Sequence, residues 1–252
     1  MRKVILTVAV CATVFGISTA QAATDEEKCL AGRAKAKGKY EKCVEDQLGK
    51  GYGSSFADYT KFLEKMAKCR IKYAGAWTKL QGLGTTCAVA SRYTDNGNGT
   101  ISDNLTGLVW EKKSDNGDVH DKNTARTWST GAPYNGNGTA FTTFLRDGLN
   151  AGAGFAGAND WRVPTFAELQ TTLLPEPYPC TTSPCVDAAF NTGCVATCTV
   201  LTCSCTQSNY YWSATTVAGC PLCGWSVDFN DGLVFIGNKP NGLYARAVRG
   251  GL

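Results

Sequence analysis

The sequence predicts an α+β protein in which an α-helical hairpin precedes a domain of two helices packed on twisted antiparallel strands. The composition changes near residue 89, from segments rich in Ala, Lys and Glu to segments rich in Gly, Asn, Thr and aromatic residues. The charge divides at the same place, because residues 24–88 carry 13 Lys/Arg and 8 Asp/Glu, whereas residues 89–252 carry 10 and 13. Beyond Cys11, the cysteines also divide, into four up to Cys87 and eight from Cys180 onward. We therefore expect three segments: 1–23, 24–88 and 89–252.

The first segment has the features of a secretory signal peptide. Arg2 and Lys3 precede an apolar stretch over residues 4–17, and the sequence AQA at 20–22 is a small-x-small cleavage site. The apolar stretch is short for a membrane span, and Cys11 lacks the small residue that precedes a lipid-modified cysteine. Twelve further cysteines in an exported chain are expected to form disulfides. We predict an exported protein, periplasmic, cell-surface or extracellular, without a membrane span.

Residues 25–48 and 55–80 are predicted to form two helices around the glycine-rich break GKGYGS. Both segments are rich in good helix formers and free of proline. Thr24 or Asp25 can cap the first helix, and Ser54 or Ser55 the second. In the second helix an apolar stripe recurs at steps of three and four residues, namely Phe62, Met66, Cys69, Tyr73 and Trp77.

An antiparallel hairpin of these helices favours the nested disulfides Cys29–Cys87 and Cys43–Cys69. Such bonds would compensate for the small core that two helices can bury. We interpret the hairpin as a spacer, self-association or docking element. Its positive charge either favours an anionic partner, such as an acidic polysaccharide or a cell surface, or belongs to a solvated helix face.

The stretch RYTDNGNGTISDNLTGLVWEK, residues 92–112, predicts three short strands joined by turns. Asn-Gly supplies the positive φ of a hairpin turn at DNGNG. An EF-type calcium loop starting at Asp95 is excluded, because its ligand positions would fall on Gly97 and Gly99 and its glycine position on Thr100.

Two helices and a strand-rich tail follow. Phe141, Phe144, Leu145 and Leu149 indicate one helix, and VPTFAELQTTL indicates another, with Phe166, Leu169 and Leu173 facing the core. Thr165 and Glu168 form a capping box at the start of the second helix. In the tail, GWSVDF and LVFIG are strands around the hairpin signal NDG, and LYARAVRG closes the domain.

These motifs, in this order, resemble the DUF1566 family, known from the C-terminal domain of a Legionella collagen-like adhesin. The resemblance covers residues 90–250 and rests on the 92–112 stretch followed by TARTWSTG, GTAFTTFLRDGLN, GANDWRVPTFAELQTTL, YYWSATT, GWSVDFNDGLVFIGNK and GLYARAVRG. It implies a C-type lectin-like fold, related to that of the formylglycine-generating enzyme, and a role in surface recognition. The sugar-coordinating EPN and QPD triplets of C-type lectins are absent from the sequence, which argues against calcium-dependent sugar binding.

A cysteine-rich insert at 178–223 departs from the family pattern. We expect a local Cys180–Cys185 disulfide. The other bonds are expected to tie the rest of the insert to its last turn, at 220–223. Zinc is the alternative, through Cys203-x-Cys205 and Cys220-x-x-Cys223, but an oxidising compartment favours disulfides. In lectin-like folds a long loop of this kind displays the recognition surface, so the insert is a candidate specificity element. The cysteines with unassigned partners are Cys194, Cys198, Cys203, Cys205, Cys220 and Cys223.

Candidate ligand residues are those whose aromatic, amide or carboxylate groups could meet a sugar at the surface: Tyr178, Tyr210, Tyr211, Asp228, Asn230 and Asp231. A second set is interpreted as a structural network of arginines and acids: Asp160, Arg162, Arg246 and Arg249. An inward-pointing Arg246 would require a carboxylate partner.

The tryptophans of the motifs are assigned to the core: Trp110, Trp161, Trp212 and Trp225. His120, the only histidine, lies in a polar stretch and is expected at the solvent.

The sequence therefore predicts a non-enzymatic, adhesin- or lectin-like recognition module for a glycan or a cell-surface protein. It contains no readable serine–histidine–acid arrangement or phosphate-binding glycine loop, and we expect no cofactor, metal or nucleic-acid partner. Two alternatives stay open. One is a structural part of a surface assembly that self-associates through the hairpin. The other is an enzyme of the formylglycine-generating type, which requires a reactive cysteine pair.

Overall fold

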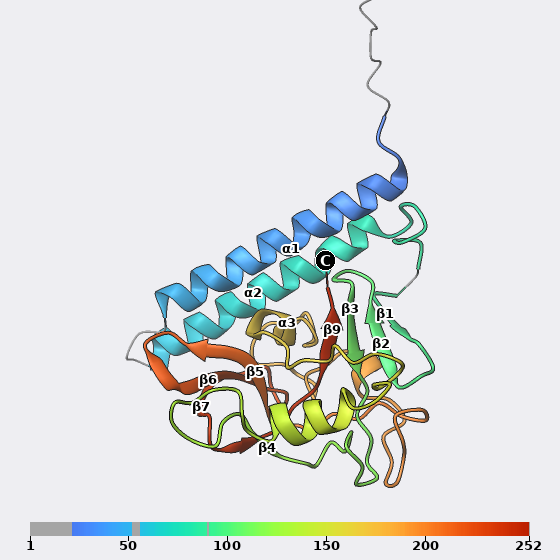
Figure 1. Ribbon diagram of the computed structural model, residues 1–252. Helices are drawn as coiled ribbons and strands as arrows, with labels where there is room; N and C mark the ends of the chain where they lie inside the picture. Colours follow the sequence, from blue (N-terminus) through green and yellow to red (C-terminus); the bar gives the residue numbers. More distant parts are fainter. Residues whose placement is uncertain (1–21, 52–55, 90, 252) are drawn as a thin grey trace, which may run out of the picture.

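A computed structural model describes residues 22–51, 56–89 and 91–251. The helical hairpin, α1 (Asp25–Lys50) and α2 (Phe56–Leu80), lies along one side of the β-rich remainder (Figure 1). Thr24 caps α1 in a capping box with Glu27, which confirms one of the two predicted caps. Residues 1–21 of the predicted signal peptide and the predicted caps Ser54 and Ser55 lie outside the described residues.

Both nested disulfides predicted for the hairpin are present. Cys29 pairs with Cys87, and Cys43 pairs with Cys69. The apolar stripe of α2 is buried along its whole length, from Phe62 to Trp77. Hairpin residues share one hydrophobic cluster with residues of the following domain, so the helices complete the core of the β-rich part.

Two buried arginines fix the hairpin on the domain. The Arg33 guanidinium donates to the carbonyl of Leu105. Arg70 donates to the carbonyls of Leu174 and Glu176 at 2.7 and 3.0 Å. Because burial disfavours the charged form, it lowers the pKa of Arg70 to about 10. These bonds set the rotation of both helices about their axes.

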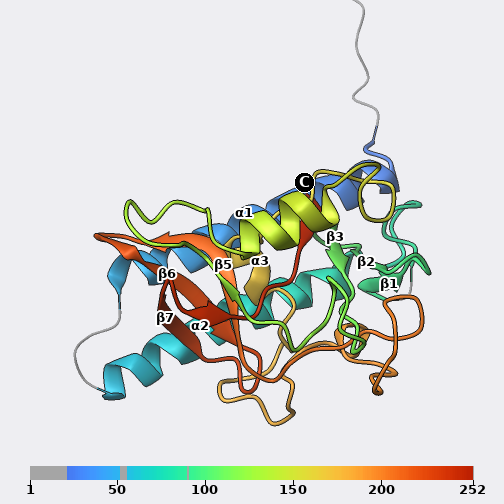
Figure 2. The ribbon, with the colours of Figure 1, turned by 60° about the horizontal axis from the view of Figure 1, so that its bottom comes forward.

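The β-rich part contains two larger antiparallel sheets at opposite ends (Figures 1 and 2). The first consists of β1 (Tyr93–Asp95), β2 (Thr100–Asp103), β3 (Leu108–Glu111) and the C-terminal β9 (Val248–Gly250) in that order. The second consists of β5 (Tyr210–Val217), β6 (Cys220–Asp228) and β7 (Val234–Asn238). A short pair joins β4 (Arg126–Thr127) to β8 (Gly242–Leu243).

The predicted turn at DNGNG connects β1 to β2. Gly97 and Gly99 both have positive φ. A Cβ at Gly99 would lie 2.8 Å from Val200 Cγ2, so glycine is also required by the insert that packs there. The predicted opening meander is thus confirmed.

Three helical segments complete the domain. The segment η1 (Ala140–Leu149) matches the predicted helix but is wound as a π-helix. α3 (Phe166–Gln170) begins with the predicted capping box of Thr165 and Glu168. It ends before Leu173, which is nevertheless buried as expected. A single 3-10 turn, η2 (Ala188–Phe190), lies in the insert.

The architecture is therefore mixed α+β, with a disulfide-linked helical hairpin followed by antiparallel sheets. The tryptophans assigned to the core are buried: Trp110, Trp161, Trp212 and Trp225. Within the described part of the chain, no helix combines the length and apolar character needed to cross a membrane. Six disulfides indicate an oxidising compartment.

We predict that the Cys29–Cys87 bond contributes more stability than the Cys220–Cys223 bond. Their sequence separations are 58 and 3 residues. The entropy lost by the unfolded chain on loop closure predicts about 4 kcal/mol for the long loop and about 2 kcal/mol for the short one. Urea unfolding of the Cys29→Ala/Cys87→Ala and Cys220→Ala/Cys223→Ala variants measures both. Equal losses would contradict the prediction.

Candidate functional site

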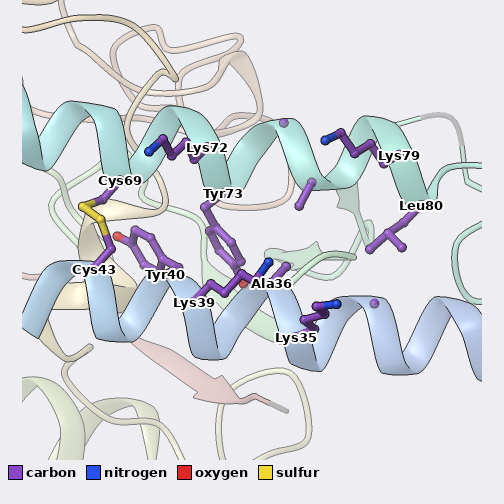
Figure 3. A pocket seen from close by; sticks show the side chains of 13 residues that line it. Lys35, Ala36, Lys39, Tyr40, Cys43, Cys69, Lys72, Tyr73, Lys79 and Leu80 are labelled. Carbon is purple, nitrogen blue, oxygen red and sulfur yellow. A yellow bond between two sulfur atoms is a disulfide. The ribbon is translucent and has the colours of Figure 1, made fainter.

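A groove of about 570 Å³ runs between α1 and α2 (Figure 3). Its floor is apolar, formed by Ala36, the rings of Tyr40 and Tyr73, and the Cys43–Cys69 disulfide. Lysines from both helices surround this floor, Lys35 and Lys39 from α1 and Lys72 and Lys79 from α2. The groove thus combines an apolar bed with a cationic rim.

Residue size and the disulfide explain why the helices leave this space open. Small residues of both helices line it, including Gly32 and Ala36 on α1 and Gly75 and Ala76 on α2. The rings of Tyr40 and Tyr73 stack at 4.5 Å across the floor. At the end opposite the disulfide the helices approach closely, since a Cβ at Gly32 would lie 2.3 Å from a Leu80 methyl group.

The four groove lysines have exposed side chains and form no ion pair with any residue of the described chain. Other lysines of α1 differ, because Lys28 and Lys42 pair with Asp25 and Asp46 on their own helix. None of the described residues that line the groove is acidic. Its positive charge is therefore available to an anionic group from outside.

The predicted ligand residues gather elsewhere, at one edge of the β5–β6–β7 sheet. Tyr178 and Tyr210 are half-buried, and burial raises the pKa of both phenols. The nearby carboxylates of Asp228 and Asp231 raise the pKa of both phenols further. The Tyr210 ring lies 4.9 Å from that of Phe235, which is 42% exposed. Tyr178, Tyr210, Asp228 and Asp231 thus lie close together.

The two remaining candidates have different surroundings. Asn230 is exposed and accepts a hydrogen bond from the Ser183 hydroxyl at 2.8 Å. Tyr211, by contrast, is 0% exposed, so its prediction as a surface ligand residue is wrong. Strand alternation explains this: the side chain next to Tyr210 on β5 points inward, where it stacks on Phe229 at 4.4 Å. Burial raises the pKa of Tyr211 to about 12.

Two of the predicted network arginines form surface ion pairs. Arg249 donates to Asp160 at 2.6 Å, as the Arg–Asp interpretation expects. Arg162 instead forms a bidentate pair with Glu168, whose carboxylate also completes the capping box of α3. These contacts connect the start of α3 to the sheet edge near β9.

Arg246 is fully buried, but its predicted carboxylate partner is replaced by carbonyl groups. Its guanidinium donates to the backbone oxygens of Glu111 at 2.8 Å and Cys205 at 2.6 Å, and to the Thr206 hydroxyl. It also lies over the ring of Phe190. Carbonyl dipoles and an aromatic face therefore solvate this charge, while the Glu111 carboxylate acts only from a distance.

The side chain of Glu111, at the end of β3, is the centre of this buried network. One carboxylate oxygen accepts from Lys113 Nζ at 3.1 Å and lies 2.8 Å from His120 Nδ1, and the other accepts from Ala247 N at 2.9 Å. Burial raises the pKa of Glu111, but Lys113 and His120 outweigh it and the net pKa is lowered. Burial lowers the pKa of Lys113 to about 8.

The expectation of a solvent-exposed His120 is wrong, since it is buried against the Glu111 carboxylate.

Within the insert, the predicted Cys180–Cys185 bond is present. The expected bonds from the insert to the turn at 220–223 are wrong. Cys220 pairs with Cys223 inside the turn. Cys194 pairs with Cys205, and Cys198 pairs with Cys203. Close sequence neighbours are thus linked, and each bond braces a local loop. Backbone hydrogen bonds hold the insert to the domain instead, including Cys205 N to the carbonyl of Lys113 at 2.8 Å.

The protein is a disulfide-stabilised α+β module of an oxidising compartment. It has two exposed surfaces, the lysine groove of the hairpin and the edge around Tyr178 and Tyr210. The chain belongs to the Lcl C-terminal domain family, whose model matches residues 99–249. The match begins at the turn before β2 and ends in β9, so it leaves out the hairpin and its groove. No curated protein and no solved structure matched the chain.

We predict that neutralising Glu111 destabilises the fold strongly. In a Glu111→Gln variant three buried cations, Lys113, Arg126 and Arg246, lose their shared carboxylate, and breaking a buried ion pair in this way costs about 3–5 kcal/mol. The control is Asp160→Asn at the exposed Arg249 pair, which should cost less than about 1 kcal/mol. Urea unfolding at neutral pH measures both variants. A loss below that of the control would contradict the central role of Glu111.

Proposed function

We propose that this protein is an exported, non-enzymatic recognition module that binds an anionic glycan of a cell surface through the lysine groove of its hairpin. The observation that carries the proposal is the rim of four exposed lysines over an apolar floor, none of which has an ion-pair partner among residues 22–51, 56–89 and 91–251. Sulfate or carboxylate groups of a polysaccharide would meet the ammonium groups. The apolar faces of its sugar rings would lie on the floor of the groove.

The edge around Tyr178 and Tyr210 supports recognition as a second contact surface. It presents aromatic rings, with Phe235 exposed beside Tyr210, and hydrogen-bonding groups of Asp228 and Asn230. We propose that residues 89–252 have a C-type lectin-like arrangement and that this edge adds specificity to the charge-based binding at the groove. Family membership and six disulfides are consistent with a surface-directed role.

The charges of the groove favour an anionic partner over a second copy of the hairpin. Two such grooves facing each other would bring eight lysines together without compensating acids. The alternative of a formylglycine-type enzyme requires reactive thiols, whereas each of the twelve cysteines from Cys29 to Cys223 lies in a disulfide. Both observations support recognition of a separate molecule.

The test compares two variants of equal charge. One replaces the groove lysines by glutamine, at Lys35, Lys39, Lys72 and Lys79. The other replaces four exposed lysines of the hairpin that do not line the groove, Lys50, Lys61, Lys65 and Lys68. Calorimetric titration with a sulfated polysaccharide at several salt concentrations should show a loss of affinity of about tenfold or more for the groove variant. The control should lose much less, and salt should weaken binding by the wild type.

Two results would refute the groove as the binding site. One is an equal loss of affinity in both variants, which would show that only net charge matters. The other is wild-type affinity in the groove variant. A folded wild-type protein that binds neither sulfated polysaccharides nor other anionic glycans would refute the function itself.

A further inference from the structure

The insert brings the sulfur atoms of Cys194, Cys198, Cys203 and Cys205 into one compact cluster. Two disulfides join them in pairs, Cys194–Cys205 and Cys198–Cys203. The two bonds lie directly against each other, because Cys205 Sγ is 3.6 Å from Cys198 Sγ and 3.7 Å from Cys203 Sγ. Three of these side chains are buried and that of Cys194 is half-buried. The cluster is therefore held inside the insert and is not a set of exposed thiols.

The two distances from Cys205 Sγ to the sulfurs of the other bond match two edges of a tetrahedral metal–thiolate centre. Zinc–sulfur bonds of about 2.3 Å place neighbouring thiolates about 3.8 Å apart. Cys194 Sγ also lies within 4.8 Å of Cys198 Sγ and Cys205 Sγ. To bind one metal ion, the two bonded pairs of sulfur atoms would have to separate, and Cys203 Sγ would have to move toward Cys194 Sγ.

The charges around the cluster supply an independent argument. Lys113, Arg126 and Arg246 are buried around one carboxylate, that of Glu111. One of these cations reaches the cluster with its charged group, because the Arg246 guanidinium donates to the Cys205 carbonyl at 2.6 Å. Lys113 contacts the cluster only through its backbone carbonyl, which accepts from Cys205 N at 2.8 Å. Two disulfides are neutral, whereas Zn²⁺ with four thiolates carries a net charge of about −2 and would add to the stabilisation that carbonyl groups and the Phe190 ring give to Arg246.

We propose that Cys194, Cys198, Cys203 and Cys205 form a redox-dependent zinc site, which is occupied when both disulfides are reduced. Two molecules of a dithiol would supply four electrons and four protons, reduce the two S–S bonds to four thiols, and become two disulfides themselves. Binding of Zn²⁺ then releases the four thiol protons and forms four Zn–S bonds, without a change in the oxidation state of zinc. The insert would keep a cross-linked shape in both states.

The test uses residues 24–252, reduced with a phosphine and titrated with Co²⁺ as a coloured substitute for Zn²⁺. We expect one Co²⁺ per chain with the visible and charge-transfer absorption of a tetrahedral tetrathiolate, and loss of that absorption when Zn²⁺ is added. Replacing the four cluster cysteines by serine should abolish the signal. Replacing Cys180, Cys185, Cys220 and Cys223 by serine removes the same number of thiols and should preserve it.

A Cys194→His variant separates metal binding from disulfide structure. Its imidazole can ligate the metal but cannot form a disulfide, and Cys194 is the member of the cluster that is half-buried and not fully buried. We expect this variant to bind one Co²⁺ with a shifted spectrum, whereas Cys194→Ser should bind it at least about tenfold more weakly. Absence of tetrathiolate absorption in the reduced wild type, or equal loss in both four-serine variants, would overturn the proposal.

Discussion

The buried Glu111 carboxylate is the interaction on which the β-rich part depends. It joins the end of β3, the segment of His120 and the backbone before β9, three regions that are far apart in the sequence. Lys113 and Arg246, which surround it, also hold the cysteine-rich insert through the backbone of Cys205. Removing the charge of this one side chain therefore affects the first sheet and the insert together. The buried cations outnumber this one carboxylate, and the surrounding carbonyl groups and aromatic rings stabilise the remaining positive charge.

The hairpin groove depends on a separate set of constraints. The Cys43–Cys69 disulfide and the Tyr40–Tyr73 stack set the distance between the helices, while small residues leave the space between them unfilled. Arg33 and Arg70 fix the other side of the hairpin to the domain. The disulfide and the docking contacts hold the two helices in place, so an anionic ligand would order only the lysine side chains and not the backbone of the groove.

Local patterns in the sequence predicted the elements well, because turn chemistry and capping act over a few residues. The capping box at Thr165 and the turn at Gly97 and Gly99 are of this kind. The nested hairpin disulfides join residues far apart in the sequence, and they were predicted because two antiparallel helices bring those cysteines together. Tyr210 and Tyr211 were both expected at the surface, but adjacent residues of a strand point to opposite faces, and Tyr211 is the buried one. The groove was missed for a different reason. The sequence showed an excess of lysine, but only the disulfide and the rotation of the docked helices bring residues of α1 and α2 to one rim.

The central claim, that the groove holds a polyanion, is tested most directly by lysine acetylation followed by mass spectrometry, with and without a saturating sulfated polysaccharide. We expect the polysaccharide to protect Lys35, Lys39, Lys72 and Lys79 from acetylation. Lysines of α2 that do not line the groove, Lys61, Lys65 and Lys68, should remain reactive in the same sample. Protection confined to those three, or no protection of the groove lysines under conditions where binding is complete, would contradict the account.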